Sequence, residues 1–495
     1  MSGAITDSPL YKLINPGSIA FFGASNNFGS MGTSQLASLL SLGFQGRIYP
    51  VHPKETAVLG LKAYRNVADL PETPDLAVMI LPTRIVLDTV TQCGEKGIKN
   101  AIIVSGGFRE VGAKGCDLEQ NLIQITHRYG MRFLGPNCLG IANPHHKLNT
   151  TFLPYRGKAG FLGMVSQSGS FITQMFDYLS RIGMGFSTAI SVGNEADIDL
   201  VEGLKYLAAC PHTKVISLYI ETIRNPKSFI EAASALTLSK PVIAYYVGGS
   251  ESGKQACLSH TGALSGPDRL YDGVFRQTGI IRARSIEEMF DTASLFGNVP
   301  EPRGNRLVIQ THSGGPGAVA ADACDREGLK VPAMPDAVKK ELSTHVPHTG
   351  SIGNPVDITF SKDRLAYFSS IPGCLLDADH FDILLIYLLL PKHMFSRVME
   401  SMGVPENQIA AETEKLIDEL AEKIEELVKT FGKPVIGFSF HSQEEFFIKS
   451  LRARNIPVMQ GPHRAARALS ALCRYTKWRE DRYASTKHPV HPSSL

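Results

Sequence analysis

The stretch Ser-Ile-Ala-Phe-Phe-Gly-Ala-Ser-Asn-Asn-Phe-Gly-Ser-Met-Gly occupies residues 18–32 and decides the fold of the N-terminal part. Its first five residues form a largely apolar run, which is typical of a strand buried on both faces of a parallel sheet. The glycine-rich remainder predicts a tight turn and then a helix whose first N–H groups are free to receive phosphate. Its spacing differs from GxGxxG, so a plain NAD site is not favoured.

The same strand–turn–helix unit recurs along the chain. Within the first set, further strands are expected at residues 47–51, 76–80 and 100–104, with a helix at residues 84–97. A second set of strand–turn–helix units begins near Lys158, with strands expected at residues 160–165, 215–220 and 241–246. A third set begins at Arg306, with strands expected at residues 306–310, 383–390, 434–440 and 456–458. Repeated βα units predict parallel, doubly wound sheets that bind ligands at the carboxyl ends of their strands.

The fold class is therefore α/β, with three doubly wound parallel-sheet domains. We expect a Rossmann-like domain over residues 10–150, a flavodoxin-like domain over 151–300 and a second flavodoxin-like domain over 305–475. The polar, proline-containing residues 476–495 are expected to fray.

Bulk composition restricts the class of protein. The 495 residues are 43% apolar and 20% charged with a net charge of +3, which gives no support to a general nucleic-acid surface. The eight cysteines show neither CxxC pairs nor metal spacing, so we expect reduced thiols and no metal site. No signal peptide is visible, and the longest apolar run falls far short of the ~20 residues needed to cross a bilayer. A cytoplasmic protein that does not contact membranes is expected.

Two segments of the second domain carry chemistry. Ser168 and Gly169 lie between a strand and an apolar-periodic helix, so their free N–H groups and the helix dipole favour an anion. The segment Ser259-His260-Thr261-Gly262 is expected to be a flexible loop between Gly253 and Gly266. A neutral imidazole is a nucleophile near neutral pH and can accept a phosphoryl group, although an isolated histidine is more often structural.

These segments together resemble the succinyl-CoA synthetase superfamily, and residues 258–264 are similar to the phosphohistidine loop of ADP-forming acyl-CoA synthetases. The resemblance covers roughly residues 10–475. It implies that His260 is the phosphorylated residue and that Glu221, at the end of a strand, fixes the imidazole tautomer. Without the resemblance, Glu221 could equally be a solvated charge at a strand end.

The resemblance also implies a CoA site in the first domain. The matching segments are the turn 23–25, residues 53–54, 81–83 and 105–108, and the Gly-Pro-Asn-Cys stretch at 135–138. The CoA-binding residues implied are Gly23, Ser25, Pro53, Lys54, Pro82, Ser105, Gly106, Asn137 and Cys138. Cys138 is as readily explained as a small buried residue.

In the third domain, Ser313, Gly314 and Gly315 resemble a second glycine-led helix that points at the same phosphate. The implied reaction is acid + CoA + NTP ⇌ acyl-CoA + NDP + phosphate through an acyl phosphate and phospho-His260. The cofactors implied are CoA, phosphate and ATP/ADP or GTP/GDP with Mg²⁺. No segment resembles an ATP-grasp module, so the nucleotide is expected on a separate ATP-grasp β-type subunit of a hetero-oligomer.

The sequence leaves open the effect of one residue that differs from the family pattern, and it leaves open two alternative functions. Tyr246 stands where relatives commonly have lysine, and its effect on activity is open. A CoA transferase or acyltransferase on the same fold would exchange acyl groups between CoA and small carboxylic acids without nucleotide. A non-catalytic CoA-binding regulatory protein would bind CoA without forming phosphohistidine. The sequence does not identify the carboxylic acid.

Overall fold

The computed structural model describes residues 5–261, 266–359, 365–390 and 392–487, with only the backbone described at 259–261, 394 and 485–487. The chain divides into two compact units, Met1–Ser180 with Met184–Arg284, and Arg181–Gly183 with Ser285–Leu495. None of the described helices is long and apolar enough to cross a membrane.

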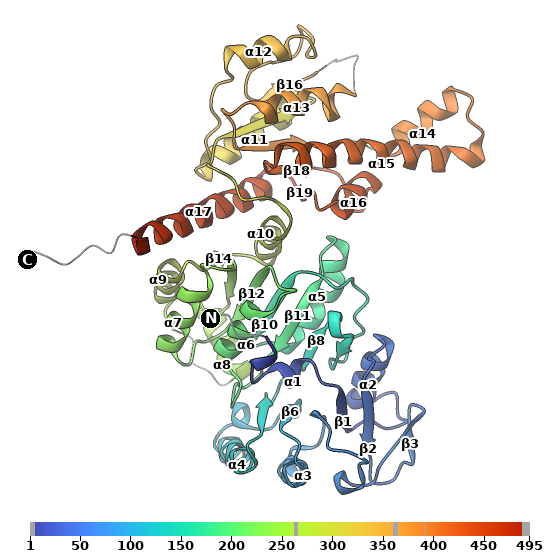
Figure 1. The fold of residues 1–495 in the computed structure, drawn as a ribbon, viewed down its shortest axis with the longest axis vertical. Coiled ribbons are helices and arrows are strands. Elements are labelled where there is room, and N and C mark those ends of the chain that lie inside the picture. Colours follow the sequence, from blue (N-terminus) through green and yellow to red (C-terminus); the bar gives the residue numbers. More distant parts are fainter. Residues whose placement is uncertain (1–4, 262–265, 360–364, 391, 488–495) are drawn as a thin grey trace, which may run out of the picture. The chain divides into compact units, whose positions relative to one another are not determined.

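The first unit contains two sheets (Figure 1). The N-terminal sheet has five parallel strands in the order β2-β1-β5-β6-β7. These strands are β1 (Ser18–Phe22), β2 (Arg47–Val51), β5 (Leu76–Met79), β6 (Asn100–Ile103) and β7 (Arg132–Leu134). The remaining elements of this part are η1 (Ile5–Asp7), α1 (Tyr11–Ile14), α2 (Met31–Ser41), β3 (Ala57–Val58), β4 (Leu61–Lys62), η2 (Val67–Asp69), α3 (Thr83–Lys96), η3 (Arg109–Val111) and α4 (Ala113–Tyr129).

The second sheet has seven strands in the order β14-β13-β12-β10-β11-β8-β9. The strands are β8 (Ile141–Asn143), β9 (Leu148–Asn149), β10 (Leu162–Ser166), β11 (Phe186–Ser191), β12 (Val215–Ile220), β13 (Val242–Tyr246) and β14 (Ile281–Ala283). Its helices are η4 (Pro144–His146), α5 (Gly169–Arg181), α6 (Leu200–Ala209), α7 (Pro226–Leu236), α8 (Glu251–Thr261) and α9 (Asp268–Thr278). Strands β8 and β9, which the sequence did not predict, pair antiparallel at one edge of an otherwise parallel sheet.

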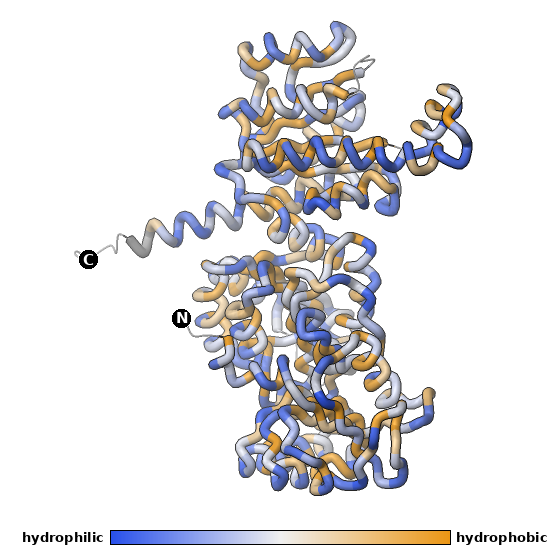
Figure 2. Tube along the Cα trace, turned by 45° about the vertical axis from the view of Figure 1, so that its right-hand side comes forward, coloured by the Kyte–Doolittle hydropathy of each residue, from blue (hydrophilic) through white to orange (hydrophobic). Residues whose placement is uncertain are grey.

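The second unit is built on a five-stranded parallel sheet with the order β16-β15-β17-β18-β19. The strands are β15 (Leu307–Thr311), β16 (Val356–Asp357), β17 (Ile383–Tyr387), β18 (Val435–Ser439) and β19 (Val458–Gln460). Its helices are α10 (Ile286–Asn298), α11 (Gly314–Arg326), α12 (Asp336–Leu342), η5 (Ala366–Phe368), α13 (Ser370–Asp377), α14 (Lys392–Ser401), α15 (Glu406–Phe431), α16 (Phe446–Ala453) and α17 (Pro462–Lys487). In α15 hydrophilic and hydrophobic residues alternate along the helix (Figure 2), and the buried residues recur at helical spacing from Ile409 to Ile424.

The five parallel strands of each sheet share one connectivity. In each case the second parallel strand along the chain pairs with one side of the first, and the third pairs with its other side. The first strands are β1, β10 and β15, and the connections run in opposite directions on their two sides. In open α/β sheets ligands bind at this switch point, beyond the carboxyl ends of the strands. The turns after β1, β10 and β15 are the Gly- and Ser-rich segments singled out from the sequence.

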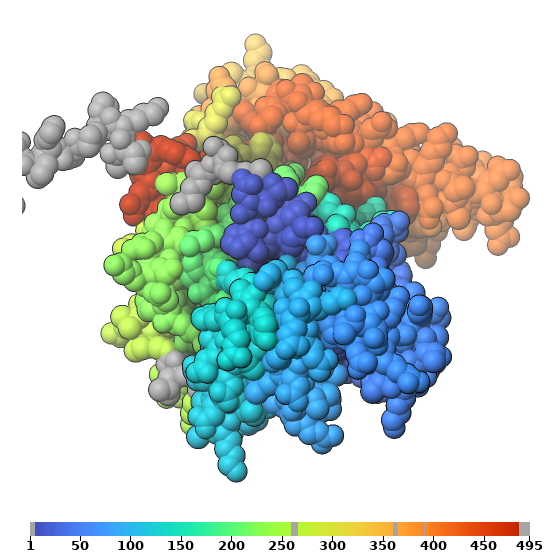
Figure 3. Space-filling view, turned by 60° about the horizontal axis from the view of Figure 1, so that its bottom comes forward, coloured from blue at the N-terminus to red at the C-terminus, as the bar shows by residue number. Residues whose placement is uncertain are grey.

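The predicted α/β class with several parallel sheets is confirmed, and each of the predicted ranges 10–150, 151–300 and 305–475 holds the five parallel strands of one large sheet. One hydrophobic core joins residues of α1 and β1 to residues of β11 and α6, and the first two sheets lie together in one compact unit. Asn15 donates a hydrogen bond to the Tyr206 hydroxyl (2.7 Å), and Figure 3 shows the dark-blue N-terminal segment against the green region. Residues 141–149, assigned to the first domain, supply strands to the second sheet.

Two helices lie where predicted domains end. Helix α10, at the end of the predicted 151–300 domain, lies in the second compact unit, where Asp291 pairs with Arg464 of α17 (Nε to Oδ2, 2.6 Å). Residues 476–487 continue α17 instead of starting a frayed tail. Aromatic and ionic contacts hold this extension, because Arg479 pairs with Glu301 and Tyr475 stacks on Trp478. Residues 488–495 lie outside the described part.

Candidate active site

The turn between β1 and α2 brings a helix start into direct contact with the end of a strand. Gly23 has φ +90°, and a Cβ there would lie 1.9 Å from the Ile80 carbonyl oxygen. A Cβ on Gly32, in the first turn of α2, would lie 2.2 Å from the Gly23 carbonyl oxygen. Ser30 caps the helix by accepting a hydrogen bond from the Thr33 N–H (3.3 Å). Only glycine allows this approach, which leaves a helix N-terminus at the switch point of the first sheet.

The loop after β2 is fastened to this turn. The Asn26 amide donates to the Ala57 carbonyl (2.9 Å) and its oxygen accepts from the Leu59 N–H (3.2 Å). Ser25 is fixed through its own N–H, which donates to Thr33 Oγ1 (3.0 Å). Pro53 and Lys54 lie exposed on this loop. The Lys54 side chain is thus accessible, and its predicted contact with CoA stays a prediction.

A second pair of loops meets at the carboxyl ends of β5 and β6. The Ser105 hydroxyl accepts from the Leu81 N–H (3.0 Å), and the Thr83 hydroxyl donates to the Gly106 carbonyl (2.5 Å). Pro82 is the residue immediately before α3. The carbonyl oxygen of Ser105 in turn accepts a hydrogen bond from the Asn137 N–H (3.0 Å). Three segments that are distant in the sequence are therefore brought together at one edge of the sheet.

A cavity of about 370 Å³ lies between these loops and the start of α5. Four predicted CoA residues line it, namely Ser105, Gly106, Asn137 and Cys138, together with Gly169 from the predicted phosphate site. The remaining predicted CoA residues, Gly23, Ser25, Pro53, Lys54 and Pro82, are not among its lining residues. The cavity thus joins the first sheet to the second within one unit.

Cys138 lies in this cavity as an inert thiol. It is 3% exposed, its Sγ lies 3.5 Å from the Ile103 carbonyl oxygen, and burial raises its pKa to about 12. A thiol with this pKa is protonated at neutral pH and is a poor nucleophile. The structure therefore favours the interpretation of Cys138 as a small buried residue that shapes the wall.

The predicted anion site at the start of α5 is well ordered by local bonds. The Ser166 hydroxyl donates to the Ser168 carbonyl (2.6 Å) and accepts from the Ser168 N–H (3.2 Å). The helix begins at Gly169, and Gly169 and Ser170 both face the cavity. The first N–H groups of a helix have no partner within it, so this end of α5 presents donors and a positive dipole end to the cavity.

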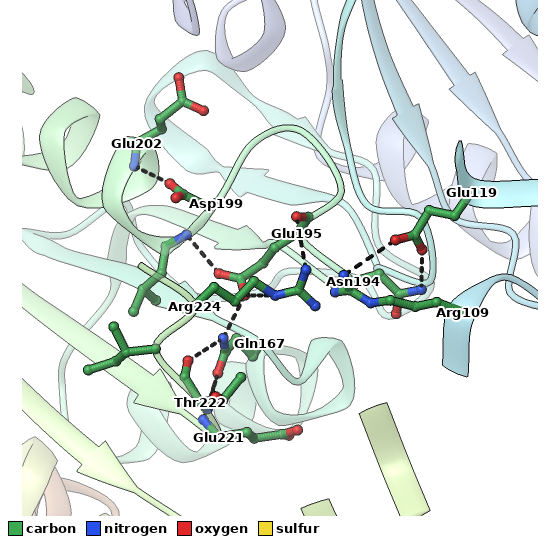
Figure 4. A network of polar contacts seen from close by, with 12 residues as sticks. Arg109, Glu119, Gln167, Asn194, Glu195, Asp199, Glu202, Glu221, Thr222 and Arg224 are labelled. Carbon is green, nitrogen blue, oxygen red and sulfur yellow. Dashed lines mark hydrogen bonds and ion pairs between the residues drawn. The ribbon is translucent and has the colours of Figure 1, made fainter. Parts of the chain in front are cut away.

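Gln167 connects that turn to Glu221. Glu221 directly follows β12, is 3% exposed, and donates its N–H to Gln167 Oε1 (2.6 Å). Gln167 is itself a lining residue of the cavity. Figure 4 shows the Glu221 side chain directed away from Gln167. The backbone of the predicted histidine-orienting residue is thus tied to the cavity wall.

Sequence reasoning missed a buried polar network around Glu195 (Figure 4). Glu195 accepts hydrogen bonds from Gln167 Nε2 (2.8 Å) and from the Leu200 N–H (2.8 Å), and pairs with Arg224 (Nε to Oε2, 3.2 Å). The adjacent Asn194 accepts from the Asn137 amide (3.3 Å) and donates to Glu119 Oε2 (3.0 Å). The available signal was the position of Asn194-Glu195 just after β11, the strand that neighbours β10.

We expect Glu195 to make the stability of the protein pH-dependent. Burial, only partly offset by the bond from Gln167, raises the pKa of Glu195 from 4.5 to about 7. Between these values the folded form keeps a proton that the unfolded form has lost, so the stabilisation is present at low pH and is lost as pH rises toward 7. Urea unfolding of the wild type and Glu195→Gln should show a difference in unfolding free energy that changes by up to roughly 3 kcal/mol between pH 5 and 8. Parallel pH profiles would contradict the assignment.

His260 lies on the backbone of α8, and its side chain is outside the described part of the structure. The sequence predicted a loop from Gly253 to Gly266, but residues 251–261 form a helix, because this stretch is rich in helix formers such as Glu, Lys, Gln, Ala and Leu. Residues 262–265 are outside the described part. The role of His260 therefore stays a prediction.

Tyr246, the departure from the common lysine, has a definite structural role. Its hydroxyl donates to the Gly266 carbonyl (2.7 Å), and its ring stacks on Tyr271 with centroids 3.6 Å apart. The Tyr271 hydroxyl accepts the N–H of Ile223 (3.1 Å), two residues after Glu221. Tyr246 thus connects residue 266 to the end of β12.

Ser313, Gly314 and Gly315 occupy the equivalent position in the second unit. Ser313 precedes α11, and its N–H donates to Thr311 Oγ1 (3.2 Å), repeating the Ser166–Ser168 arrangement. Gly314 and Gly315 lie exposed in the first turn of the helix. The prediction that they share a phosphate with α5 involves both units and stays a prediction. Among the described residues there is no group of three His, Cys, Asp or Glu that could hold a metal.

Three family models match the chain in the order of its sheets. Residues 17–144 match a CoA binding domain, residues 159–296 a succinyl-CoA ligase like flavodoxin domain, and residues 307–430 a ligase-CoA domain. These matches confirm the predicted superfamily and the CoA-binding character of the first domain.

Similar proteins cover nearly the whole chain. The α subunit of acetate–CoA ligase (ADP-forming) II of Pyrococcus furiosus is 37% identical over 94% of this chain and 97% of its own length. The 4-hydroxybutyrate–CoA ligase (ADP-forming) of Nitrosopumilus maritimus is a longer protein. It is 34% identical over a region that covers 96% of this chain and 65% of the ligase. The solved dinucleotide-forming acetyl-coenzyme A synthetase 1 of Ca. Korarchaeum cryptofilum, in complex with phosphate and ADP, matches with a TM-score of 0.84 and 32% identity over 97% of this chain and 99% of that chain. The chain therefore belongs to the family of ADP-forming acyl-CoA ligases and matches the part that some relatives carry as a separate α subunit.

Proposed function

We propose that this chain is the CoA-binding and phosphohistidine subunit of an acyl-CoA synthetase that interconverts acid, CoA and NTP with acyl-CoA, NDP and phosphate. The observation that carries the proposal is the 370 Å³ cavity, because it brings the Gly-Pro-Asn-Cys segment and the Ser105-Gly106 loop together with the first turn of α5. A thioester site and a phosphoryl site must share one space if phosphate is to attack the acyl carbon.

The residues around the cavity fit CoA. The glycine contact between Gly23 and Gly32 lets backbone donors approach a pyrophosphate, and the accessible Lys54 supplies a positive charge on the neighbouring loop. Ser105, Gly106 and Asn137 would hold the thiol end, and CoA supplies the thiol that forms the acyl thioester. Ser25, Pro82 and Cys138 would form further parts of the wall of the CoA site.

In the second half of the reaction, the side chains of this chain handle the phosphoryl group. His260 attacks the phosphorus of the acyl phosphate and holds the phosphoryl group as a phosphoramidate, while the P–O bond to the acyl group breaks and the free acid leaves as carboxylate. The first turn of α5 at Ser168-Gly169 stabilises the phosphoryl charge through backbone donors. Glu221 accepts a hydrogen bond from the other ring nitrogen and so fixes the tautomer. Ser313, Gly314 and Gly315 add donors from the second unit.

The nucleotide belongs to a partner in this proposal. Relatives that match over their full length are named α subunits, whereas others are longer single chains. We infer a hetero-oligomer with an ATP-grasp β-type subunit that binds ADP or GDP with Mg²⁺ and takes the phosphoryl group from His260. A small carboxylic acid is the organic substrate, and a cytoplasmic location would supply both CoA and nucleotide.

The test is to incubate the pure chain with ³²P-labelled phosphate and a panel of acyl-CoAs. We expect acid-labile, base-stable label that depends on one class of acyl-CoA, since phosphoramidates have this lability. Acyl exchange between CoA and free acids without phosphate would contradict the proposal and favour a CoA transferase. CoA binding with neither label nor exchange would favour a regulatory protein.

A further inference from the structure

Gln167 uses all of its hydrogen-bonding capacity in a buried position. It is 4% exposed, and Oε1 accepts the N–H groups of Glu221 (2.6 Å) and Thr222 (3.1 Å). Nε2 donates to the Thr222 carbonyl (2.8 Å) and to Glu195 Oε2 (2.8 Å). A carboxamide offers two acceptor and two donor sites, so none is left over.

These partners fix the direction of the amide. Backbone N–H groups can only donate, while a carbonyl and a carboxylate accept, so turning the amide over would break all four bonds. Glu195 is in turn held by the Leu200 N–H (2.8 Å) and by Arg224 (3.2 Å), with Arg109 and Asp199 as the other charges that act on it. A rigid series of contacts therefore runs from Glu195 through Gln167 to the backbone of Glu221 (Figure 4).

We propose that Gln167, oriented by Glu195, is a positioning residue that sets the place of the Glu221 carboxylate relative to the cavity. This inference rests on the proposed function, in which Glu221 orients His260. Glu221 lies beyond the end of β12, where the backbone leaves the sheet. At this point the side-chain amide of Gln167, rather than the backbone of a neighbouring strand, accepts the Glu221 N–H. This bond links the end of β12 to the turn before α5. Glu195 acts one step further away, through the amide.

Reversing the hydrogen bond between residues 167 and 195 tests the proposal. In Gln167→Glu at a pH alkaline enough to ionise both carboxyl groups, a carboxylate would face the Glu195 carboxylate with no proton between them. In Glu195→Gln, the amide nitrogens of both residues can face each other. A displacement of about 1 Å at Glu221 is expected to slow His260 phosphorylation by roughly 10- to 100-fold in either variant.

Two rescues distinguish positioning from general damage. Lowering the pH should speed labelling of Gln167→Glu relative to wild type, because the new carboxyl group at position 167 can, once protonated, again donate to Glu195. The double variant Gln167→Glu/Glu195→Gln restores a donor–acceptor pair with reversed polarity. Its labelling rate should exceed that of Gln167→Glu by roughly tenfold, although the bond to the Thr222 carbonyl stays broken.

A matched control and a second readout complete the design. Glu119→Gln changes another buried carboxyl of the same network that does not contact Gln167, and it should label within about twofold of wild type. Deuterium uptake of a peptide covering residues 219–224 should rise in both single variants and fall back in the double variant, because the side chain at position 167 that accepts the Glu221 and Thr222 N–H groups is displaced and then restored.

The outcomes separate this inference from the proposed function. If the wild-type chain forms no phosphohistidine, the proposed function fails, and unchanged deuterium uptake in the variants would independently overturn the positioning role. If the wild type labels and both single variants label at the same rate, positioning is overturned while the function stands. Slow single variants without recovery in the double variant would also overturn it.

Discussion

Replacement of His260 by alanine is expected to abolish phosphoryl labelling of the chain by labelled phosphate and acyl-CoA. Alanine has no nucleophile, and a phosphoramidate cannot form on a serine or threonine nearby. Peptide mapping of the labelled wild type should place the acid-labile label on residues 255–269, and this label should be at background in His260→Ala. Overall synthesis of acyl-CoA with the proposed nucleotide-binding partner should be lost in parallel, because in the proposed reaction the phosphoryl group passes through His260.

The matched control is another histidine of the same unit. His212 is exposed and stacks on His145 with ring centroids 4.0 Å apart, in the connection between β11 and β12. His212→Ala should retain the label, since that ring lies outside the cavity lining. Undiminished label in His260→Ala would rule out the phosphohistidine at this position, whatever the activity of the control.

The strands were predictable from sequence because each is a short apolar run buried on both faces. The predicted strands at residues 18–22, 47–51 and 215–220 have the bounds found in the structure, and the other predicted strands differ by a few residues at their ends. Strands β8 and β9 could not be found this way. They are two or three residues long, and pairing at the edge of a sheet that belongs mainly to a later segment leaves no periodic pattern.

Helix α8 and the end of α17 were missed for opposite reasons. Gly253 and Gly262 suggested a loop around His260, yet Gly253 packs closely on the Val247 carbonyl, where an added Cβ would lie 2.4 Å away, and the helix continues past it. The tail lacks an apolar face, so local pattern predicted fraying. Long-range contacts from Arg479 and Tyr475 decide its helical state instead.

The site was predictable only where its signal is local. The glycine-led turn at residues 23–32 and the Ser168-Gly169 helix start are contiguous motifs. By contrast, Gln167, Glu195 and Glu221 are 28 and 26 residues apart along the chain, and each alone is an ordinary polar residue. They meet because β10 pairs with both β11 and β12, which places three strand ends side by side. The order of the strands in the sheet, and not a local sequence motif, brings these three residues together.

The contact between α2 and the β1 turn leads to the second large effect, which is expected in Gly32→Ala. The added Cβ would lie 2.2 Å from the carbonyl oxygen and 2.5 Å from the carbonyl carbon of Gly23. Both neighbours are backbone, so no side-chain rotation can relieve the overlap and the helix start must move. We expect a loss of unfolding free energy of roughly 1–3 kcal/mol, measured by urea unfolding.

In the proposed CoA site the N–H groups of the first turn of α2 face the cofactor phosphates, so the same displacement should weaken CoA binding. Isothermal titration with CoA is expected to show an affinity at least roughly tenfold lower than that of the wild type. Gly273→Ala is the matched control, since Gly273 lies in α9 of the same unit and an added Cβ there meets no atom within 4 Å. That variant should gain up to about 1 kcal/mol through helix propensity and bind CoA normally. Equal affinities in both variants would show that the start of α2 does not form part of the CoA site, and the cofactor phosphates would then have to be bound elsewhere on the first sheet.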